Sequence, residues 1–74
     1  MADPAPETIR VVVNGQSRSV ATGQTVLGLL RSLGLDPSRL AIELNGRIVR
    51  QTEWAATPLE AGAQLEIVHF VGGG

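Results

Sequence analysis

The 74-residue sequence contains no cysteine, lysine or tyrosine, and each absence excludes a class of chemistry. Without cysteine the chain has neither a disulfide framework nor a thiolate zinc site. Its single histidine, His69, cannot form a metal site alone. The remaining candidate nucleophiles are hydroxyls, which need an adjacent base to react. We therefore expect a protein that is not an enzyme by itself and that binds no cofactor or metal.

Clustered positive charge and stacked aromatic residues are also missing. The formal net charge is −1, the six basic residues are scattered arginines, and Trp54 and Phe70 are the only aromatic residues. Nucleic-acid-binding proteins need a basic patch, and single-strand binders stack bases on aromatic rings. No apolar run approaches the roughly 20 residues of a membrane helix, and residues 1–8 do not look like a signal peptide. We expect a cytoplasmic protein with no nucleic-acid or membrane partner.

What the sequence does contain is the pattern of one small domain. Residues 1–8 (MADPAPET) show no apolar periodicity and predict a disordered tail. Alternating β-branched residues from Ile9 to Val13 then predict a strand. The dipeptide Asn14-Gly15 is typical of a hairpin turn, because both residues accept positive φ, and Gln16–Val20 would be the returning strand.

After this hairpin, the apolar residues recur with the period of a helix. Val26, Leu29, Leu30 and Leu33 recur at the spacing of one helix face. Thr25 is the expected N-cap and Gly34 the expected residue that ends the helix, with Leu35 and Leu30 forming the apolar pair of a Schellman motif. Gly28 inside the helix either allows close approach to the sheet or is simply tolerated.

The second half of the chain predicts three more strands. Residues 40–44 alternate as a strand, Asn45-Gly46 is a second hairpin turn, and residues 47–50 form a short return strand. Residues 51–63 are expected to be irregular, with Trp54 holding them on the core. Residues 64–71 form the last strand, and the glycines of residues 72–74 follow it directly.

This order of elements predicts an α+β fold. One helix with one apolar stripe covers one face of a mixed sheet of four to five strands, and the last strand pairs in parallel with the first. That is the ubiquitin-like β-grasp arrangement. We expect a β-grasp domain over residues 9–71 and a flexible glycine tail over residues 72–74.

Gly72, Gly73 and Gly74 are the most informative feature. A phosphate-binding glycine loop needs a helix after it, and here none follows. Three glycines form a thin segment that spans at most about 10 Å and enters a narrow site on another protein. It would carry one reactive group, the Gly74 carboxylate. The alternative is an inert end.

The sequence resembles the ThiS family of sulfur carriers. The resemblance runs from about Ile9 to the end. It rests on these segments in order: Val13-Asn14-Gly15, Gly23-Gln24-Thr25-Val26 with Leu29-Leu30, Ala41-Ile42, Asn45-Gly46, Ile48-Val49, Trp54, Gly62 and the terminal Gly73-Gly74. The leading tail and the third glycine, Gly72, depart from the family pattern.

The resemblance implies a route for sulfur through the glycine tail. An ATP-using, ThiF-like adenylyltransferase would adenylate the Gly74 carboxylate. Sulfur from a donor such as a cysteine desulfurase would convert it to a thiocarboxylate, which thiazole synthase (ThiG-like) would use for thiamine. Two alternatives remain open: the small subunit of molybdopterin synthase or another sulfur carrier, and a β-grasp interaction module with an inert tail.

A docking patch is predicted beside the tail. In the last strand Leu65 and Ile67 should face the helix, so Val68 and Phe70 should lie on the uncovered sheet face, and Val12 on the first strand would extend them. Two alternatives would hide these residues: residues 51–63 could fold over them, or a bulge could change the alternation.

Overall fold

The first hairpin forms as the sequence predicts. The computed structural model describes residues 7–70, in which β1 (Thr8–Val13) pairs antiparallel with β2 (Gln16–Ala21). Asn14 and Gly15 both have positive φ, at 49° and 81°, and this allows a two-residue turn that matches the twist of the strands. β1 begins at Thr8, one residue before its expected start, and the carbonyl of Glu7 accepts a hydrogen bond of 3.0 Å from the backbone N–H of Thr22. The prediction of a disordered tail is therefore wrong for Glu7 and Thr8, which the hairpin holds in place, and residues 1–6 lie outside the described residues.

The helix α1 (Val26–Ser32) begins and ends at the predicted residues. At its start, the Thr25 hydroxyl accepts a hydrogen bond of 3.1 Å from the backbone N–H of Gly28. At its end, Gly34 has a φ of 72°, and the backbone N–H of Leu35 donates to the carbonyl of Leu30 at 3.0 Å. This bond is the long-range bond of a Schellman motif, so the predicted cap is confirmed.

Gly28 does not serve contact with the sheet. The atoms nearest to where its Cβ would lie belong to the side chains of Gln24 and Thr25, in the turn that precedes the helix. The Gln24 side-chain oxygen also accepts a hydrogen bond of 3.1 Å from the backbone N–H of Thr25. The missing side chain at Gly28 therefore leaves room for Gln24 to fold back over the start of α1.

The second half of the chain supplies the other three strands and two short 3₁₀ helices. After η1 (Pro37–Arg39) come β3 (Leu40–Leu44), β4 (Arg47–Val49), η2 (Gln51–Ala56) and β5 (Gln64–His69). Asn45, with a φ of 51°, makes the second two-residue turn together with Gly46.

The expectation that residues 51–63 are irregular is wrong for the first six of them, which form η2. The physical reason is Trp54, whose side chain is only 2% exposed. Its indole N–H donates to the carbonyl of Val49 at 2.8 Å, which requires the chain to turn back tightly after β4. The predicted role of Trp54 in holding this segment on the core is confirmed. Leu59 continues the attachment, because its backbone N–H donates to the carbonyl of Gln24 at 2.7 Å.

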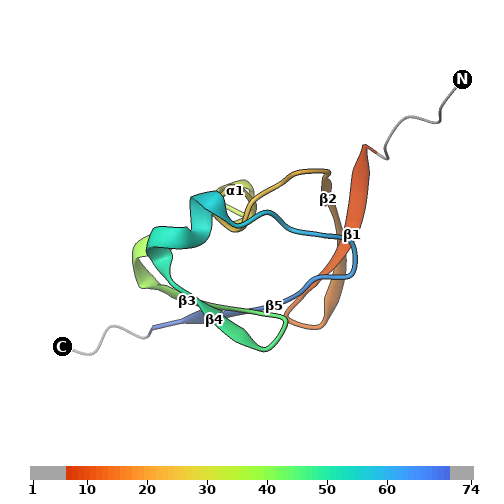
Figure 1. Cartoon of the computed structure of the whole chain (residues 1–74). Helices are drawn as coiled ribbons and strands as arrows, with labels where there is room; N and C mark the ends of the chain where they lie inside the picture. Colours follow the sequence, from red (N-terminus) through yellow and green to blue (C-terminus); the bar gives the residue numbers. More distant parts are fainter. Residues whose placement is uncertain (1–6, 71–74) are drawn as a thin grey trace, which may run out of the picture.

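The sheet has the order β2-β1-β5-β3-β4, so the last strand in the sequence lies at its centre (Figure 1). β5 pairs in parallel with β1 and antiparallel with β3. One helix covers one face of this mixed sheet, and the predicted β-grasp fold is confirmed with five strands.

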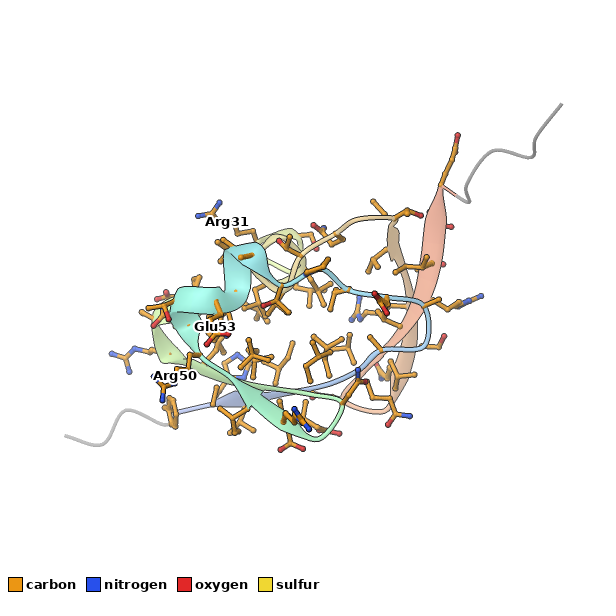
Figure 2. The ribbon with its side chains drawn as sticks, viewed as in Figure 1. Arg31, Arg50 and Glu53 are labelled. Carbon is orange, nitrogen blue, oxygen red and sulfur yellow. The ribbon has the colours of Figure 1, made fainter. Side chains whose placement is uncertain are left out.

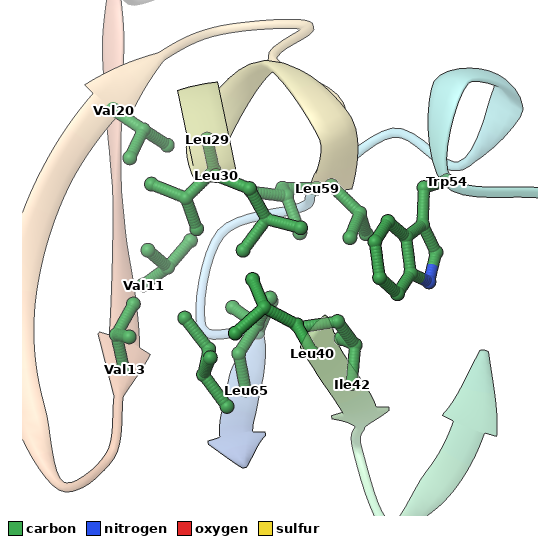
Figure 3. Close-up of a cluster of buried hydrophobic side chains, with 13 residues drawn as sticks. Val11, Val13, Val20, Leu29, Leu30, Leu40, Ile42, Trp54, Leu59 and Leu65 are labelled. Atoms are coloured by element: carbon green, nitrogen blue, oxygen red, sulfur yellow. The ribbon is translucent and has the colours of Figure 1, made fainter. Parts of the chain in front are cut away.

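The core lies between the sheet and the layer formed by α1 and η2. Figure 3 shows Leu29 and Leu30 of the helix reaching toward Leu65 of β5, with Trp54 closing the side next to Ile42. Thirteen buried hydrophobic residues make up this cluster: Val11, Val13, Val20, Val26, Leu29, Leu30, Leu40, Ile42, Trp54, Leu59, Ala63, Leu65 and Ile67. All helical elements in residues 7–70 lie on this side, and the opposite face, called the open face below, stays uncovered.

Candidate functional site

The segment that leads into the glycine tail is firmly held. Leu40 pairs with His69, and one residue later the backbone N–H of Phe70 donates to the carbonyl of Arg39 at 2.9 Å. Backbone hydrogen bonding to the rest of the domain therefore continues to the last described residue, one residue beyond β5. Residues 71–74, which include Gly72, Gly73 and Gly74, lie outside the described residues, so their role stays a prediction.

Both turn asparagines hold β5 in place through their side chains. The Asn14 amide accepts a hydrogen bond of 2.7 Å from the backbone N–H of Ile67 and donates one of 3.3 Å to the Ile67 carbonyl. On the other side of the strand, Asn45 accepts a bond of 2.9 Å from the backbone N–H of Gln64. From the sequence, both asparagines are expected only as turn residues. Their second role could not be found locally, because each partner lies far along the chain.

The open face exposes two of the predicted patch residues. Val68 is 55% exposed and Phe70 is 60% exposed, whereas Ile67, the residue before Val68, is buried. The β3–β5 register is continuous from Leu40–His69 to Leu44–Leu65, so no bulge changes the alternation. Neither alternative that would hide these two residues is realised.

Val12 lies apart from them on the same face. It is half-buried and pairs with Gln64, four residues before Val68 on β5. At about 3.3 Å per residue, this separates the two positions by roughly 13 Å along the strand. The structure thus brings Val68 and Phe70 together, while Val12 would be a separate contact.

Ile48, which is not among the predicted patch residues, is the most exposed large hydrophobic residue in the described part of the chain, at 70%. It lies on the edge strand β4 and pairs with Glu43 of β3, which in turn pairs with Glu66 of β5. The alternation of side chains along a strand could have predicted this exposure. Val49 packs against the core, so its neighbour Ile48 must point to the other face of the sheet.

The remaining charged residues do not complete a catalytic site. Arg31 in α1 and Glu53 in η2 lie on the helical side of the molecule, and Arg50 precedes η2 as its N-cap (Figure 2). Among residues 7–70 there is no pocket and no group of three metal-ligating side chains. No helix in that range is long and apolar enough to cross a membrane. What the described residues do show is a set of large exposed hydrophobic side chains, Ile48, Val68 and Phe70.

Comparison with known proteins indicates the ThiS family, which the sequence resembles, over most of the chain. A profile of the ThiS family matches residues 11–74. The sulfur carrier protein ThiS of Escherichia coli is 30% identical over 66 residues, which are 89% of this chain and 100% of that protein. A thiazole synthase of Magnetococcus marinus is 36% identical over 66 residues, and the chain spans 20% of its length.

Solved structures agree with this assignment. The crystal structure of the thiamine biosynthesis protein ThiS from Geobacter metallireducens matches with a TM-score of 0.78 at 30% identity, covering 89% of this chain and all of that one. A designed protein based on ubiquitin matches at 19% identity and a TM-score of 0.56, covering 93% of this chain and 98% of that one, which shows the shared fold. The family profile covers far more than half of the sequence, and the full length of the Escherichia coli carrier aligns with it. The chain therefore belongs to the ThiS family.

Proposed function

We propose that this protein is a sulfur carrier of thiamine biosynthesis and that the Gly74 carboxylate is the group that carries sulfur. The observation that supports the proposal most directly is the family match, which runs from residue 11 to the final glycines. The fold supports it as well, because β5 is paired with β3 up to His69, Phe70 is hydrogen-bonded to Arg39, and the glycine tail follows one residue later in the sequence. A partner enzyme could therefore hold the rigid domain and receive only the thin tail.

The chemistry requires an activated acyl group, because a carboxylate is ionised at neutral pH and reacts poorly with nucleophiles. A ThiF-like adenylyltransferase joins the Gly74 carboxylate to the AMP part of ATP and releases pyrophosphate. A sulfur nucleophile then attacks the acyl carbon, and AMP leaves with its phosphate oxygen. With hydrosulfide as the donor, the product is the thiocarboxylate and one proton is released.

The partners follow from these steps. The adenylyltransferase binds ATP, a cysteine desulfurase is the proposed origin of the sulfur, and thiazole synthase accepts it. The carrier holds no cofactor and catalyses no step in this scheme. Because the scheme consumes ATP, we place it in the cytoplasm.

We further propose that the adenylyltransferase docks on the open face through Val68 and Phe70, with Val12 as a more distant contact. Val68 and Phe70 are exposed apolar side chains on the strand that leads into the tail. A partner that covers them is positioned next to Gly72 and Gly73. Aromatic side chains such as that of Phe70 are enriched at protein interfaces.

The test is intact-mass analysis after incubation with ATP, the adenylyltransferase of the same organism and sulfide. The 74-residue chain should gain one sulfur in place of one oxygen, and fragmentation should locate the change at Gly74. A chain that never gains sulfur under these conditions would contradict the carrier function and favour an interaction module with an inert tail. Transfer to the large subunit of molybdopterin synthase, but not to thiazole synthase, would favour the other pathway.

A further inference from the structure

Two acidic residues occupy directly opposite positions on the open face. Glu43 of β3 and Glu66 of β5 are direct cross-strand neighbours, and Ile48 of β4 pairs with Glu43 on its other side. Val68 follows Glu66 by two residues and so points to the same face. The acidic pair therefore borders exposed apolar side chains: Ile48 lies beside Glu43 on β4, and Val68 follows Glu66 along β5, with Phe70 beyond it.

The protein itself does not neutralise this pair. Like charges directly opposite one another destabilise a sheet. Within residues 7–70, no basic side chain forms an ion pair or hydrogen bond with Glu43 or Glu66; Arg10, on the distant part of the same sheet, instead donates to the Ser17 hydroxyl at 3.2 Å. Glu43 is half-buried as a residue, whereas Glu66 is exposed.

A partner that covers Ile48 together with Val68 also comes against the acidic pair, because Glu43 adjoins Ile48 and Glu66 precedes Val68 on the same face. Carboxylates that are removed from water without a counter-charge oppose binding strongly. An apolar partner surface alone would therefore be rejected. Directly opposed side chains in a sheet have Cβ atoms about 4.5–5.5 Å apart, and the planar guanidinium of arginine offers five donors that fit two neighbouring carboxylates.

We propose that the docking partner of the open face presents an arginine, surrounded by apolar side chains, that inserts between Glu43 and Glu66. This inference rests on the proposed docking of the adenylyltransferase and specifies the chemistry of its contact surface. The acidic pair then selects the partner, because a surface without the matching cation leaves two buried charges unpaired. A second copy of this chain is the poorer occupant, since a two-fold contact centred on this row would gather four carboxylates.

The test compares Glu43→Gln/Glu66→Gln with a control, Glu53→Gln/Glu60→Gln, which removes the same charge away from the open face. Binding to the adenylyltransferase is measured by calorimetry at low and high salt. We expect the Glu43/Glu66 variant to bind about 10- to 100-fold more weakly, as is common when one side of a buried charged contact is lost. The control should stay within about twofold, because charges outside a contact contribute little.

A thermal melt separates this role from a structural one. Removing the repulsion should leave the variant at least as stable as the wild type, so weak binding with an unchanged melting temperature supports the inference. Equal or tighter binding of the variant would overturn it and would identify the carboxylates as a device against self-association. If the variant binds as well as the wild type but the wild type gains sulfur at Gly74, the proposed function survives without this contact. If the wild type neither binds the adenylyltransferase nor gains sulfur, both the contact and the proposed function are wrong.

Discussion

The side-chain amide of Asn14 forms both hydrogen bonds that a neighbouring strand would offer to Ile67, 53 residues further along the chain. The regular pairing of β1 with β5 covers only Val12–Gln64 and Val13–Leu65 before β1 turns away. Asn14 extends this pairing beyond the turn and satisfies the Ile67 backbone on that side. The first hairpin thereby fixes the central strand at a point close to the glycine tail.

We expect Asn14→Gly to lower the free energy of unfolding by about 1–3 kcal/mol, because it keeps the positive φ but leaves the partly buried N–H of Ile67 without its partner. Urea denaturation measures the loss, and hydrogen exchange at Ile67 should accelerate. The matched control is Asn45→Gly, whose lost bond to Gln64 is exposed to water, so its effect should be smaller. Equal stability of Asn14→Gly and the wild type would show that this bond does not support β5.

Gly28 and Gln24 should be energetically coupled. Alanine in the middle of a helix is favoured over glycine by about 1 kcal/mol, but a Cβ at position 28 would displace the Gln24 side chain from Thr25. We expect Gly28→Ala alone to change stability little and to stabilise the protein by about 0.5–1 kcal/mol in a Gln24→Ala background. The measurement is a double-mutant cycle by urea denaturation. Additive effects of the two substitutions would contradict the contact.

Phe70→Ala should weaken binding of the adenylyltransferase by about 1–3 kcal/mol while leaving the melting temperature unchanged, since the side chain is mostly exposed. The control lies on the other face of the same strand: Ile67→Ala should lower stability by about 2–5 kcal/mol. Calorimetry measures the affinity for the adenylyltransferase, and thermal melts measure the stability of each variant. If Phe70→Ala unfolds as easily as Ile67→Ala, Phe70 supports the fold and the docking assignment fails.

The length of the glycine tail should set the rate of sulfur loading. Deletion of Gly74 leaves a glycine carboxylate but withdraws the reacting carbon by roughly 3.5 Å. Adenylation needs reacting atoms within about 3–3.5 Å of each other and correctly oriented, so most of the rate should be lost. One residue added after Gly74 should be equally harmful, and neither change should alter the melting temperature. Intact-mass analysis over time measures the rate of sulfur loading. If the shortened and the lengthened forms both load sulfur at the wild-type rate, the length of the tail does not control loading.

Several parts of this structure could be predicted from the sequence alone, because they depend only on neighbouring residues. The two Asn-Gly turns and the helix ends at Thr25 and Gly34 could be predicted because each depends on residues a few positions apart. The alternation in the last strand likewise predicted that Ile67 is buried and Val68 exposed, because a strand has a period of two.

Only the tertiary structure decided which distant residues meet. The opposition of Glu43 and Glu66 depends on the register between β3 and β5, and a shift by one residue would have placed one of them against the core. The contact between Asn14 and Ile67 depends on β1 lying next to β5. The helix η2 depends on the packing of Trp54 into the core. Such pairings are fixed by packing the whole chain at once, because no local preference specifies which strand becomes a neighbour or in what register.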